Sequence, residues 1–273
     1  MVQSPKRLAF LLGIDLKKLR KVSKQIDKYY YEDKELKRDE DGNPRCKNGE
    51  KVFRTLHPST GLLKHIQNRI QTVLLQKIDF PENIQGGIKG KSNITNAKEH
   101  KGKKYFLCTD LKKYYPSVDH DLVYEAFLRY DFSHDVSHLL TRLTTYKYSL
   151  PQGTPTSPYL ANLVFSKYDE QIISKCEQIG LLYTRYVDDI AISSNYNFKK
   201  KVPNLLEVIR RSPFQINHEK TFYKIGPTLI TGIITKNNEL EVRDDQIKKY
   251  ESESLTKEQK KGLREYFSQV RNS

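Results

Sequence analysis

The stretch Tyr183–Ser194, YTRYVDDIAISS, places two adjacent carboxylates between two runs of β-branched and aromatic residues. Each run is typical of a β-strand that is largely buried. Tight hairpin turns favour Asn-Gly or Asp-Gly because these residues accept a positive φ angle, whereas Asp188-Asp189 brings two like charges together. The pattern predicts a hairpin whose bend is either a solvated turn or a site where a cation offsets the charge.

A second acid stands at the end of another apolar run. The segment Tyr105–Leu111, YFLCTDL, predicts a buried strand that ends near Asp110. If this strand lies beside the hairpin in one sheet, Asp110 and Asp188 converge. Converging carboxylates cannot all stay ionised without a cation, and Mg²⁺ prefers oxygen ligands of this kind. The two segments together favour a metal site over a solvated turn.

The composition favours a polyanionic partner. The chain has 273 residues, with 48 Lys and Arg against 33 Asp and Glu, a formal net charge of +15. Nucleic acid is the commonest partner of so basic a protein.

The three cysteines are far apart and show no CxxC spacing, so we expect neither a disulfide framework nor a zinc site. No apolar run reaches membrane-spanning length and the N-terminal segment lacks a signal-peptide cleavage site, so we expect a cytoplasmic protein without a membrane partner.

Helical and strand patterns alternate irregularly along the chain, which predicts an α+β fold rather than a doubly wound parallel sheet. The polar segment 33–51, with turn signals at Asp41-Gly42 and Asn48-Gly49, predicts a hairpin tip or loop. The predicted helices cover residues 1–32, 62–77, a segment capped by Ser117, a segment that Ser157 caps and Gly180 ends, 199–211, and the tail from Asp244.

Five segments, in chain order, resemble the motifs of reverse transcriptases. They are FLCTDLKKYYPSV (106–118), LPQGTPTSPYLANLVF (150–165), YVDD (186–189), INHEKT (216–221) and LITGIIT (229–235). Three further segments, RLAFLLGI (7–14), NAKEH (96–100) and ITG (230–232), resemble elements of bacterial retron reverse transcriptases. The departures are Val187 where Ala is common and Lys91 where Arg is common.

The resemblance implies a right-hand polymerase. Fingers would occupy residues 1–104 with a return at about 126–155, and a palm of antiparallel strands packed on helices would occupy 105–235. A small helical thumb would occupy 236–273. The implied activity is RNA-directed DNA polymerisation with two Mg²⁺ ions, for which Mn²⁺ could substitute. As a retron-type enzyme the chain would copy a structured noncoding RNA from dNTPs into branched, RNA-linked single-stranded DNA, together with an effector protein in antiphage defence.

By the same resemblance, Asp110, Asp188 and Asp189 would be catalytic and would hold the metal ions, with the Leu111 carbonyl as a further ligand. Tyr115 would be the ring that excludes a 2′-hydroxyl and so selects dNTPs. A tyrosine beside a proline is also an ordinary core residue, and that alternative stays open.

The remaining expected site residues contact nucleotide or RNA. The nucleotide-binding residues would be Lys89, Lys91, Gln152, Gly153 and Lys220, in addition to Tyr115. The RNA-binding residues would be Arg54, Lys64, Arg69, Asn96 and His100. For the lysines and arginines the alternative is a solvated surface position, for Gln152-Gly153 an ordinary turn, and for His100 a structural role.

Three other functions remain alternatives. The first is another bacterial reverse transcriptase, of the group II intron or abortive-infection type. The second is a non-catalytic RNA-binding scaffold with a polymerase fold, although such a scaffold would not need a costly cluster of carboxylates. The third is a metal-dependent nuclease.

Overall fold

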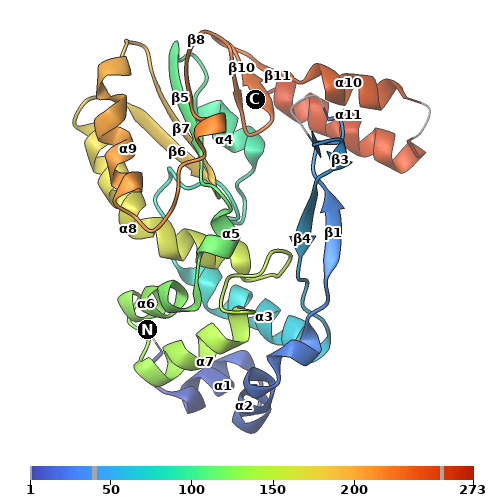
Figure 1. Cartoon of the computed structure of the whole chain (residues 1–273), viewed down its shortest axis with the longest axis vertical. Helices are drawn as coiled ribbons and strands as arrows, with labels where there is room; N and C mark the ends of the chain where they lie inside the picture. Colours follow the sequence, from blue (N-terminus) through green and yellow to red (C-terminus); the bar gives the residue numbers. More distant parts are fainter. Residues whose placement is uncertain (1, 39–41, 253–254) are drawn as a thin grey trace. The chain divides into compact units, whose positions relative to one another are not determined.

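The computed structural model describes residues 2–38, 42–252 and 255–273, and the chain divides into two units (Figure 1). The first, here called the helical unit, combines residues 1–35, 53–81 and 113–167. The second, the sheet unit, combines residues 36–52, 82–112 and 168–273. Both units are therefore built from segments that are far apart in the sequence. The predicted boundaries of fingers, palm and thumb stay predictions, because the two units interleave along the chain and follow other divisions.

The helical unit packs amphipathic helices around a core of leucine, isoleucine and valine. Its elements are α1 (Pro5–Leu12), α2 (Leu16–Lys24), η1 (Ile26–Tyr29), β1 (Asp33–Leu36), β4 (Phe53–Leu56), α3 (Gly61–Val73), η2 (Leu75–Lys77), α5 (Tyr114–Ser117), α6 (His120–Arg129), α7 (His134–Thr144) and the first half of α8 (Ser157–Glu177). On α3, Leu63, Ile66 and Ile70 recur at helical spacing and are fully buried. The predicted helix at 62–77 is thus present, with η2 as its last turn.

The sheet unit contains a four-stranded antiparallel sheet in the order β6-β7-β5-β8 and a three-stranded sheet in the order β11-β10-β9. Its strands are β2 (Cys46–Lys47), β3 (Glu50–Lys51), β5 (Tyr105–Asp110), β6 (Leu182–Tyr186), β7 (Asp189–Ser194), β8 (Phe222–Ile225), β9 (Thr228–Ile230), β10 (Ile233–Thr235) and β11 (Leu240–Val242). Its helices are α4 (Asn93–Glu99), η3 (Lys199–Lys201), α9 (Val202–Arg210), η4 (His218–Lys220), α10 (Asp244–Glu251) and α11 (Lys257–Arg271). The predicted strands at 105–111 and on both sides of the 188–189 pair are confirmed.

The two sheets share an apolar cluster. Phe106 of β5 packs with Ile94 of α4, Ile233 of β10, and Phe267 and Val270 of α11. Elsewhere in the sheet unit, α9 and the second half of α8 lie side by side (Figure 1), where Lys175 Nζ donates to Asn204 Oδ1 at 2.8 Å. Because β5 also lies between β7 and β8, its pairing and this packing fix the position of the residue at its end.

Three local predictions are wrong or shifted. Residues 1–32 form α1, α2 and η1 rather than one helix, because Gly13 takes a left-handed conformation (φ 66°) and the Asp15 side chain caps α2. Ser117 does not cap α6, since the Asp119 carboxylate accepts the backbone N–H of Leu122 instead. Ser157 is the first residue of α8 rather than its cap.

The polar segment 33–51 forms short strands rather than a plain loop. Asn48 (φ 52°) and Gly49 (φ 82°) form the turn between β2 and β3, as their sequence predicts. The other predicted turn includes Asp41, which lies outside the described residues. Among the residues described, no helix has the length and apolar character needed to cross a bilayer.

Candidate active site

Asp110 and the Asp188–Asp189 pair meet at one end of the central sheet. In the β5–β7 ladder, Asp110 pairs directly with Asp189. Beyond the ladder, the backbone N–H of Leu111 donates to the carbonyl of Asp188 at 3.0 Å. The structure thus brings together the four residues expected at the metal site, although they come from two distant segments of the chain.

The bend of this hairpin lies one residue earlier than an Asp-Asp turn. Because Tyr186 pairs with Asp189, the two turn residues are Val187 and Asp188, and Asp189 already belongs to β7. Val187 has φ 59°, which is rare for a β-branched residue and costs roughly 1–3 kcal/mol. Gly86 packs against this turn so closely that an added Cβ would lie 2.5 Å from the Val187 nitrogen. The turn is therefore held in a strained conformation by its surroundings.

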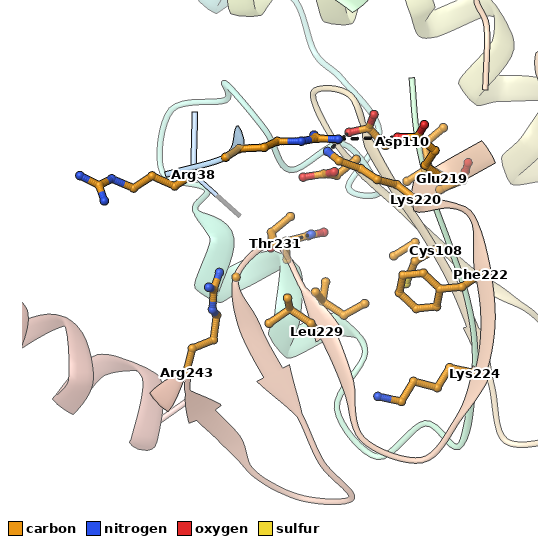
Figure 2. Close-up of a pocket in the computed structure, with 18 residues that line it drawn as sticks. Arg38, Cys108, Asp110, Glu219, Lys220, Phe222, Lys224, Leu229, Thr231 and Arg243 are labelled. Carbon is orange, nitrogen blue, oxygen red and sulfur yellow. Dashed lines mark hydrogen bonds and ion pairs between the residues drawn. The ribbon is translucent and has the colours of Figure 1, made fainter. Parts of the chain in front are cut away.

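Asp110 is held by three contacts from the segment 217–220. Its Oδ1 accepts a hydrogen bond from Lys220 Nζ at 2.8 Å and its Oδ2 accepts one from Asn217 Nδ2 at 3.0 Å. Its backbone carbonyl accepts the Asn217 N–H at 2.7 Å. Figure 2 shows the Lys220 side chain extending toward Asp110 from η4, the short helix that precedes β8. Asn217 was not among the expected site residues, although its place in INHEKT, three residues before Lys220, could have indicated it.

The charges at this end of the sheet shift the pKa values of two side chains. Asp189 is exposed as a residue, yet the protein around its carboxylate and the charges of Asp188 and Asp110 raise its pKa to about 7, while Lys220 acts in the opposite direction. Burial lowers the pKa of Lys220, but its hydrogen bond to Asp110 and the neighbouring carboxylates outweigh that effect, so the pKa is raised. An acid this hard to ionise is one that a bound cation would stabilise.

The residues fit a magnesium ion chemically, since carboxylate and carbonyl oxygens are its preferred protein ligands. The unfavourable charge of Asp189 beside Asp188 and Asp110 is the observation that supports this fit. Within residues 2–38, 42–252 and 255–273, no group of three or more His, Cys, Asp or Glu side chains is arranged closely enough to hold a metal ion. The three aspartates therefore lie at one end of the sheet, but their side chains do not form a complete set of metal ligands.

A cavity of about 680 Å³ opens beside these carboxylates (Figure 2). Its volume is in the range of ligand-binding clefts. Its lining includes five cationic side chains, those of Arg38, Arg45, Lys220, Lys224 and Arg243, and three carboxylates, those of Asp110, Asp189 and Glu219. Among its walls, Asn96 is almost fully buried, and its Oδ1 has no hydrogen-bond partner within the described part of the chain. The cavity therefore has a small excess of cationic side chains beside the carboxylates, with a buried amide oxygen behind its wall.

The expected nucleotide-binding residues fall in both units. Lys91 donates to the carbonyls of Glu82 and Ile84 at 2.9 and 3.1 Å and pairs with the Glu82 carboxylate, so it ties its own loop together. Lys89 lies in the same loop of the sheet unit. In the helical unit, Tyr115 is half-buried, the Gln152 carbonyl accepts the N–H of His57, and Gly153 (φ 93°) packs on Pro58.

The expected RNA-binding residues also differ in their surroundings. In the helical unit Arg54 and Lys64 are exposed, whereas the Arg69 guanidinium donates to the carbonyls of Leu11 and Leu12 at the end of α1. These two bonds occupy much of the Arg69 guanidinium in a structural contact.

His100 is fully buried in the sheet unit. Its Nδ1 and Nε2 lie 2.6 and 2.7 Å from the hydroxyls of Ser193 and Thr184. Burial lowers the pKa of His100 to about 3, so its ring is neutral. Of the structural and RNA-facing roles expected for His100, these contacts support the structural one, and direct RNA contact would require the ring to leave this position.

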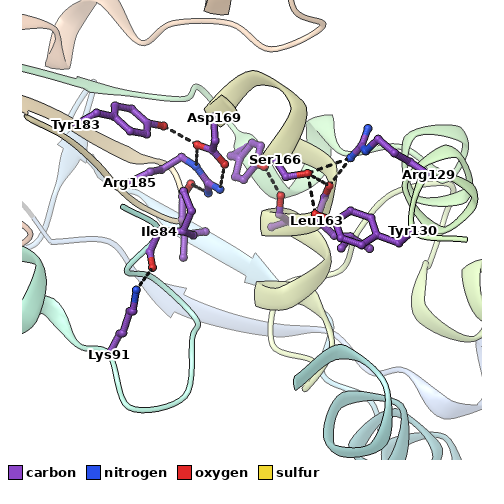
Figure 3. Close-up of polar contacts among 12 residues, drawn as sticks. Ile84, Lys91, Arg129, Tyr130, Leu163, Ser166, Asp169, Tyr183 and Arg185 are labelled. Carbon is purple, nitrogen blue, oxygen red and sulfur yellow. Dashed lines mark hydrogen bonds and ion pairs between the residues drawn. The ribbon is translucent and has the colours of Figure 1, made fainter. Parts of the chain in front are cut away.

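The buried residues Asp169 and Arg185 were not expected at the site. Their side chains form a bidentate ion pair next to the strained turn (Figure 3). The signal was present in the hairpin sequence itself, where a charged Arg185 stands inside an otherwise apolar strand.

Comparison with known proteins agrees with this architecture. Residues 46–250 match the family model described as reverse transcriptase (RNA-dependent DNA polymerase). The Retron Se72 reverse transcriptase of Salmonella heidelberg (strain 579083-10) is 32% identical over 81% of this chain and 57% of its own length. The Retron Ec86 reverse transcriptase of Escherichia coli is 32% identical over 74% of this chain and 64% of its own length. The chain thus spans about three fifths of the length of these relatives.

Two solved structures share the fold. The apo telomerase of Candida tropicalis has a TM-score of 0.51 at 10% identity, over 92% of this chain and 55% of that one. The same telomerase truncated from its C-terminal domain has a TM-score of 0.50 at 11% identity, over 84% of this chain and 61% of that one. At such low identity the likeness concerns the fold alone, and it confirms the predicted α+β polymerase fold. With the family match over most of its length and retron enzymes among its relatives, the chain belongs to the reverse transcriptase family.

Proposed function

We propose that this chain is an RNA-directed DNA polymerase of the retron type. The observation that carries the proposal is the meeting of Asp110 with Asp188 and Asp189 at the end of a central antiparallel sheet, beside a cavity whose lining includes five cationic side chains. The family match and the similarity to bacterial retron reverse transcriptases support the same activity.

In this proposal the three aspartates and the Leu111 carbonyl hold two Mg²⁺ ions, with Mn²⁺ as a substitute. Bound ions of this kind would activate the attacking hydroxyl of the primer and offset the charge of the departing pyrophosphate. The protein's own part is to hold the carboxylates together against their repulsion and to keep Lys220 beside them. Because its pKa is raised, Lys220 stays protonated at neutral pH and could give a proton to the leaving pyrophosphate.

The proposed substrates are an RNA template and dNTPs, with Tyr115, Gln152, Gly153, Lys89 and Lys91 contacting the nucleotide. Template RNA would be bound by the basic surface, including Arg54 and Lys64, and by the cations of the cavity next to Asp110. The net charge of +15 supports a phosphate-rich partner. Binding of this kind should weaken steeply as the salt concentration rises.

The test is primer extension by wild type and Asp188→Asn on an RNA template with Mg²⁺. We expect Asp188→Asn to abolish DNA synthesis while RNA binding, measured by fluorescence anisotropy, stays near the wild-type value. Asp135→Asn, which removes an exposed acid at the start of α7 in the helical unit, is the matched control and should retain synthesis. Synthesis by Asp188→Asn at the wild-type rate would refute the assignment.

The same assay separates the alternative functions. A wild-type protein that binds RNA but makes no DNA would be a scaffold. One that shortens RNA or DNA in the presence of Mg²⁺ without extending a primer would be a nuclease.

The retron character has its own test. We propose that the template is a structured noncoding RNA, that priming uses a 2′-hydroxyl of this RNA, and that the product is a branched RNA-linked DNA acting with an effector protein in antiphage defence. Nucleic acid that copurifies with the protein should contain one RNA joined to DNA through a 2′–5′ bond. Linear products primed from a 3′-hydroxyl would instead indicate another type of bacterial reverse transcriptase.

A further inference from the structure

Asp169 of α8 and Arg185 of β6 form an ion pair that is almost completely removed from solvent. The exposed fractions of the two side chains are 1% and 0%. Arg185 Nε donates to Asp169 Oδ1 at 2.8 Å and Nη2 donates to Oδ2 at 2.6 Å, so the pair is bidentate. Tyr183 Oη donates a further bond to Asp169 Oδ1 at 2.6 Å (Figure 3).

Such a pair is a poor means of stabilising a fold. Removing two charges from water costs much of what their attraction returns, and well-packed apolar residues often stabilise an interior equally well. What the pair does provide is a fixed direction for the remaining donors of the guanidinium, because the planar fork cannot rotate while both carboxylate oxygens are engaged.

One of the remaining donors points at the strained turn. Arg185 Nη1 donates to the Val187 carbonyl at 2.8 Å, and Val187 is the residue with φ 59°. The next residue is Asp188, whose own carbonyl accepts the Leu111 N–H. This hydrogen bond links the buried ion pair to the backbone that carries the paired aspartates.

Arg185 is itself fixed along its backbone by the neighbouring segment. Its N–H donates to the Asn83 carbonyl at 2.9 Å, and its carbonyl accepts the Gln85 N–H at 2.8 Å. Gly86, which follows Gln85, packs so closely on the turn that an added Cβ would lie 2.5 Å from the Val187 nitrogen. The guanidinium and the segment 83–86 thus constrain the turn through independent contacts.

We propose that Arg185, oriented by Asp169, is a positioning residue for Asp188 and Asp189. Its bond to the Val187 carbonyl keeps the turn in the left-handed conformation that sets both carboxylates opposite Asp110. The inference rests on the proposed polymerase function and deepens it, since it assigns a role to two residues that touch neither substrate nor metal.

The test compares wild type with Asp169→Asn and Arg185→Lys. Asp169→Asn keeps the side-chain shape but removes the charge that orients the guanidinium. Arg185→Lys keeps the positive charge but lacks the planar guanidinium that donates to Asp169 and to the Val187 carbonyl at the same time. Arg129→Lys is the matched control, because Arg129 also donates a guanidinium bond to a backbone carbonyl, that of Leu163, within the helical unit (Figure 3).

Primer extension on poly(rA)/oligo(dT) should show kcat lowered about tenfold or more in both test variants, with KM for dTTP within about threefold of wild type. Binding of Mn²⁺, followed by loss of the free-ion signal in electron paramagnetic resonance, should weaken in the same variants. The Arg129→Lys control should retain kcat within about twofold.

A second variant separates positioning from a general structural role. Val187→Gly accepts a positive φ without strain, so adding it to Asp169→Asn should restore kcat about threefold or more. A merely structural defect would lower the thermal unfolding temperature and would not be rescued by glycine in the turn.

The proposal is overturned if kcat and Mn²⁺ binding are unchanged in folded Asp169→Asn. It is also overturned if the fall in kcat of each variant matches its unfolded fraction and adding Val187→Gly to Asp169→Asn does not raise kcat. If wild type itself makes no DNA, the polymerase proposal fails, and Mn²⁺ binding by the same variants still decides whether the ion pair positions the carboxylates.

Discussion

Asp110 and Asp189 are direct cross-strand partners on β5 and β7, so two like charges face each other at the end of the central sheet. Opposed like charges destabilise a sheet. The pKa of Asp189 is raised to about 7, first by the surrounding protein and then by Asp188 and Asp110, so this repulsion is one part of the shift. The carboxylates that the proposed chemistry needs are therefore a source of instability in the folded chain.

The first prediction follows from this cost. The pKa of Asp189 is about 7 in the folded state against 3.8 for the unperturbed acid, so the folded state holds its proton more tightly. The contribution of Asp189 to the free energy of unfolding therefore falls as pH rises from about 4 to about 7, and the exposure of Asp189 to solvent reduces its size. Asp189→Asn removes this term, so we expect its thermal unfolding temperature to exceed that of wild type by a few degrees at pH 8. The difference should vanish near pH 4, and DNA synthesis should be lost.

Differential scanning fluorimetry from pH 4 to pH 8 measures this difference. Asp135→Asn should follow the wild-type curve throughout. An Asp189→Asn variant that is less stable than wild type at pH 8 would show that Asp189 contributes favourable contacts instead.

His100 gives a prediction of the opposite sign. Burial lowers its pKa from 6.5 to about 3, so the unfolded state binds the proton more readily. The stabilising contribution of the neutral ring is complete above pH 6.5 and is lost as pH falls from about 6.5 toward 3. We expect His100→Gln to be less stable than wild type by about 1–3 kcal/mol at pH 7.5, because the bonds to Ser193 and Thr184 are weakened.

That difference should shrink as the pH falls, by at most about 1.4 kcal/mol per pH unit. Urea unfolding of both proteins at pH 5, 6 and 7.5 measures it, and the contribution of Asp189 cancels in the comparison. A difference that is constant with pH would mean that His100 is not buried as a neutral ring.

Two glycines provide a matched pair for the third prediction. A Cβ on Gly86 would lie 2.5 Å from the Val187 nitrogen and 2.7 Å from the Tyr186 carbonyl carbon, whereas a Cβ on Gly262 in α11 meets nothing within 4 Å. We expect Gly86→Ala to displace the turn and to lower the rate of DNA synthesis by about tenfold or more.

Gly262→Ala should leave synthesis unchanged and raise stability by about 0.5–1 kcal/mol, since alanine favours a helix interior. Primer extension and thermal unfolding of both variants test the pair. Full activity of Gly86→Ala would mean that the turn tolerates the shift.

The sequence predicted the strands and the meeting of Asp110 with Asp188 and Asp189. An apolar run that ends in an acid can be recognised locally, because the apolar residues must be buried while the acid must lie at the strand end. It did not predict that Val187 would occupy the turn, because the left-handed conformation depends on Gly86, which comes from a distant segment, and on the Arg185 guanidinium, whose direction is set by Asp169. Nor did it predict the partner of Arg185, since Asp169 lies on a helix and such a pair depends on tertiary packing. Tertiary constraints on the backbone were thus the part that local patterns missed.

The last prediction concerns the choice of nucleotide. Tyr115, half-buried in the helical unit, lies at the position where the resemblance to reverse transcriptases places a ring against the sugar. If the ring excludes a 2′-hydroxyl by contact, Tyr115→Ala should lower the ratio of kcat/KM for dTTP to that for UTP by about tenfold or more. Tyr115→Phe keeps the ring and should keep the ratio, which separates the ring from its hydroxyl.

Tyr148→Ala is the control for the loss of a tyrosine in the same unit, because Tyr148 is 85% exposed. It should leave the ratio unchanged in primer extension with dTTP and UTP measured separately. An unaltered ratio in Tyr115→Ala, with normal stability, would assign Tyr115 to the core, and nucleotide choice would then depend on another residue.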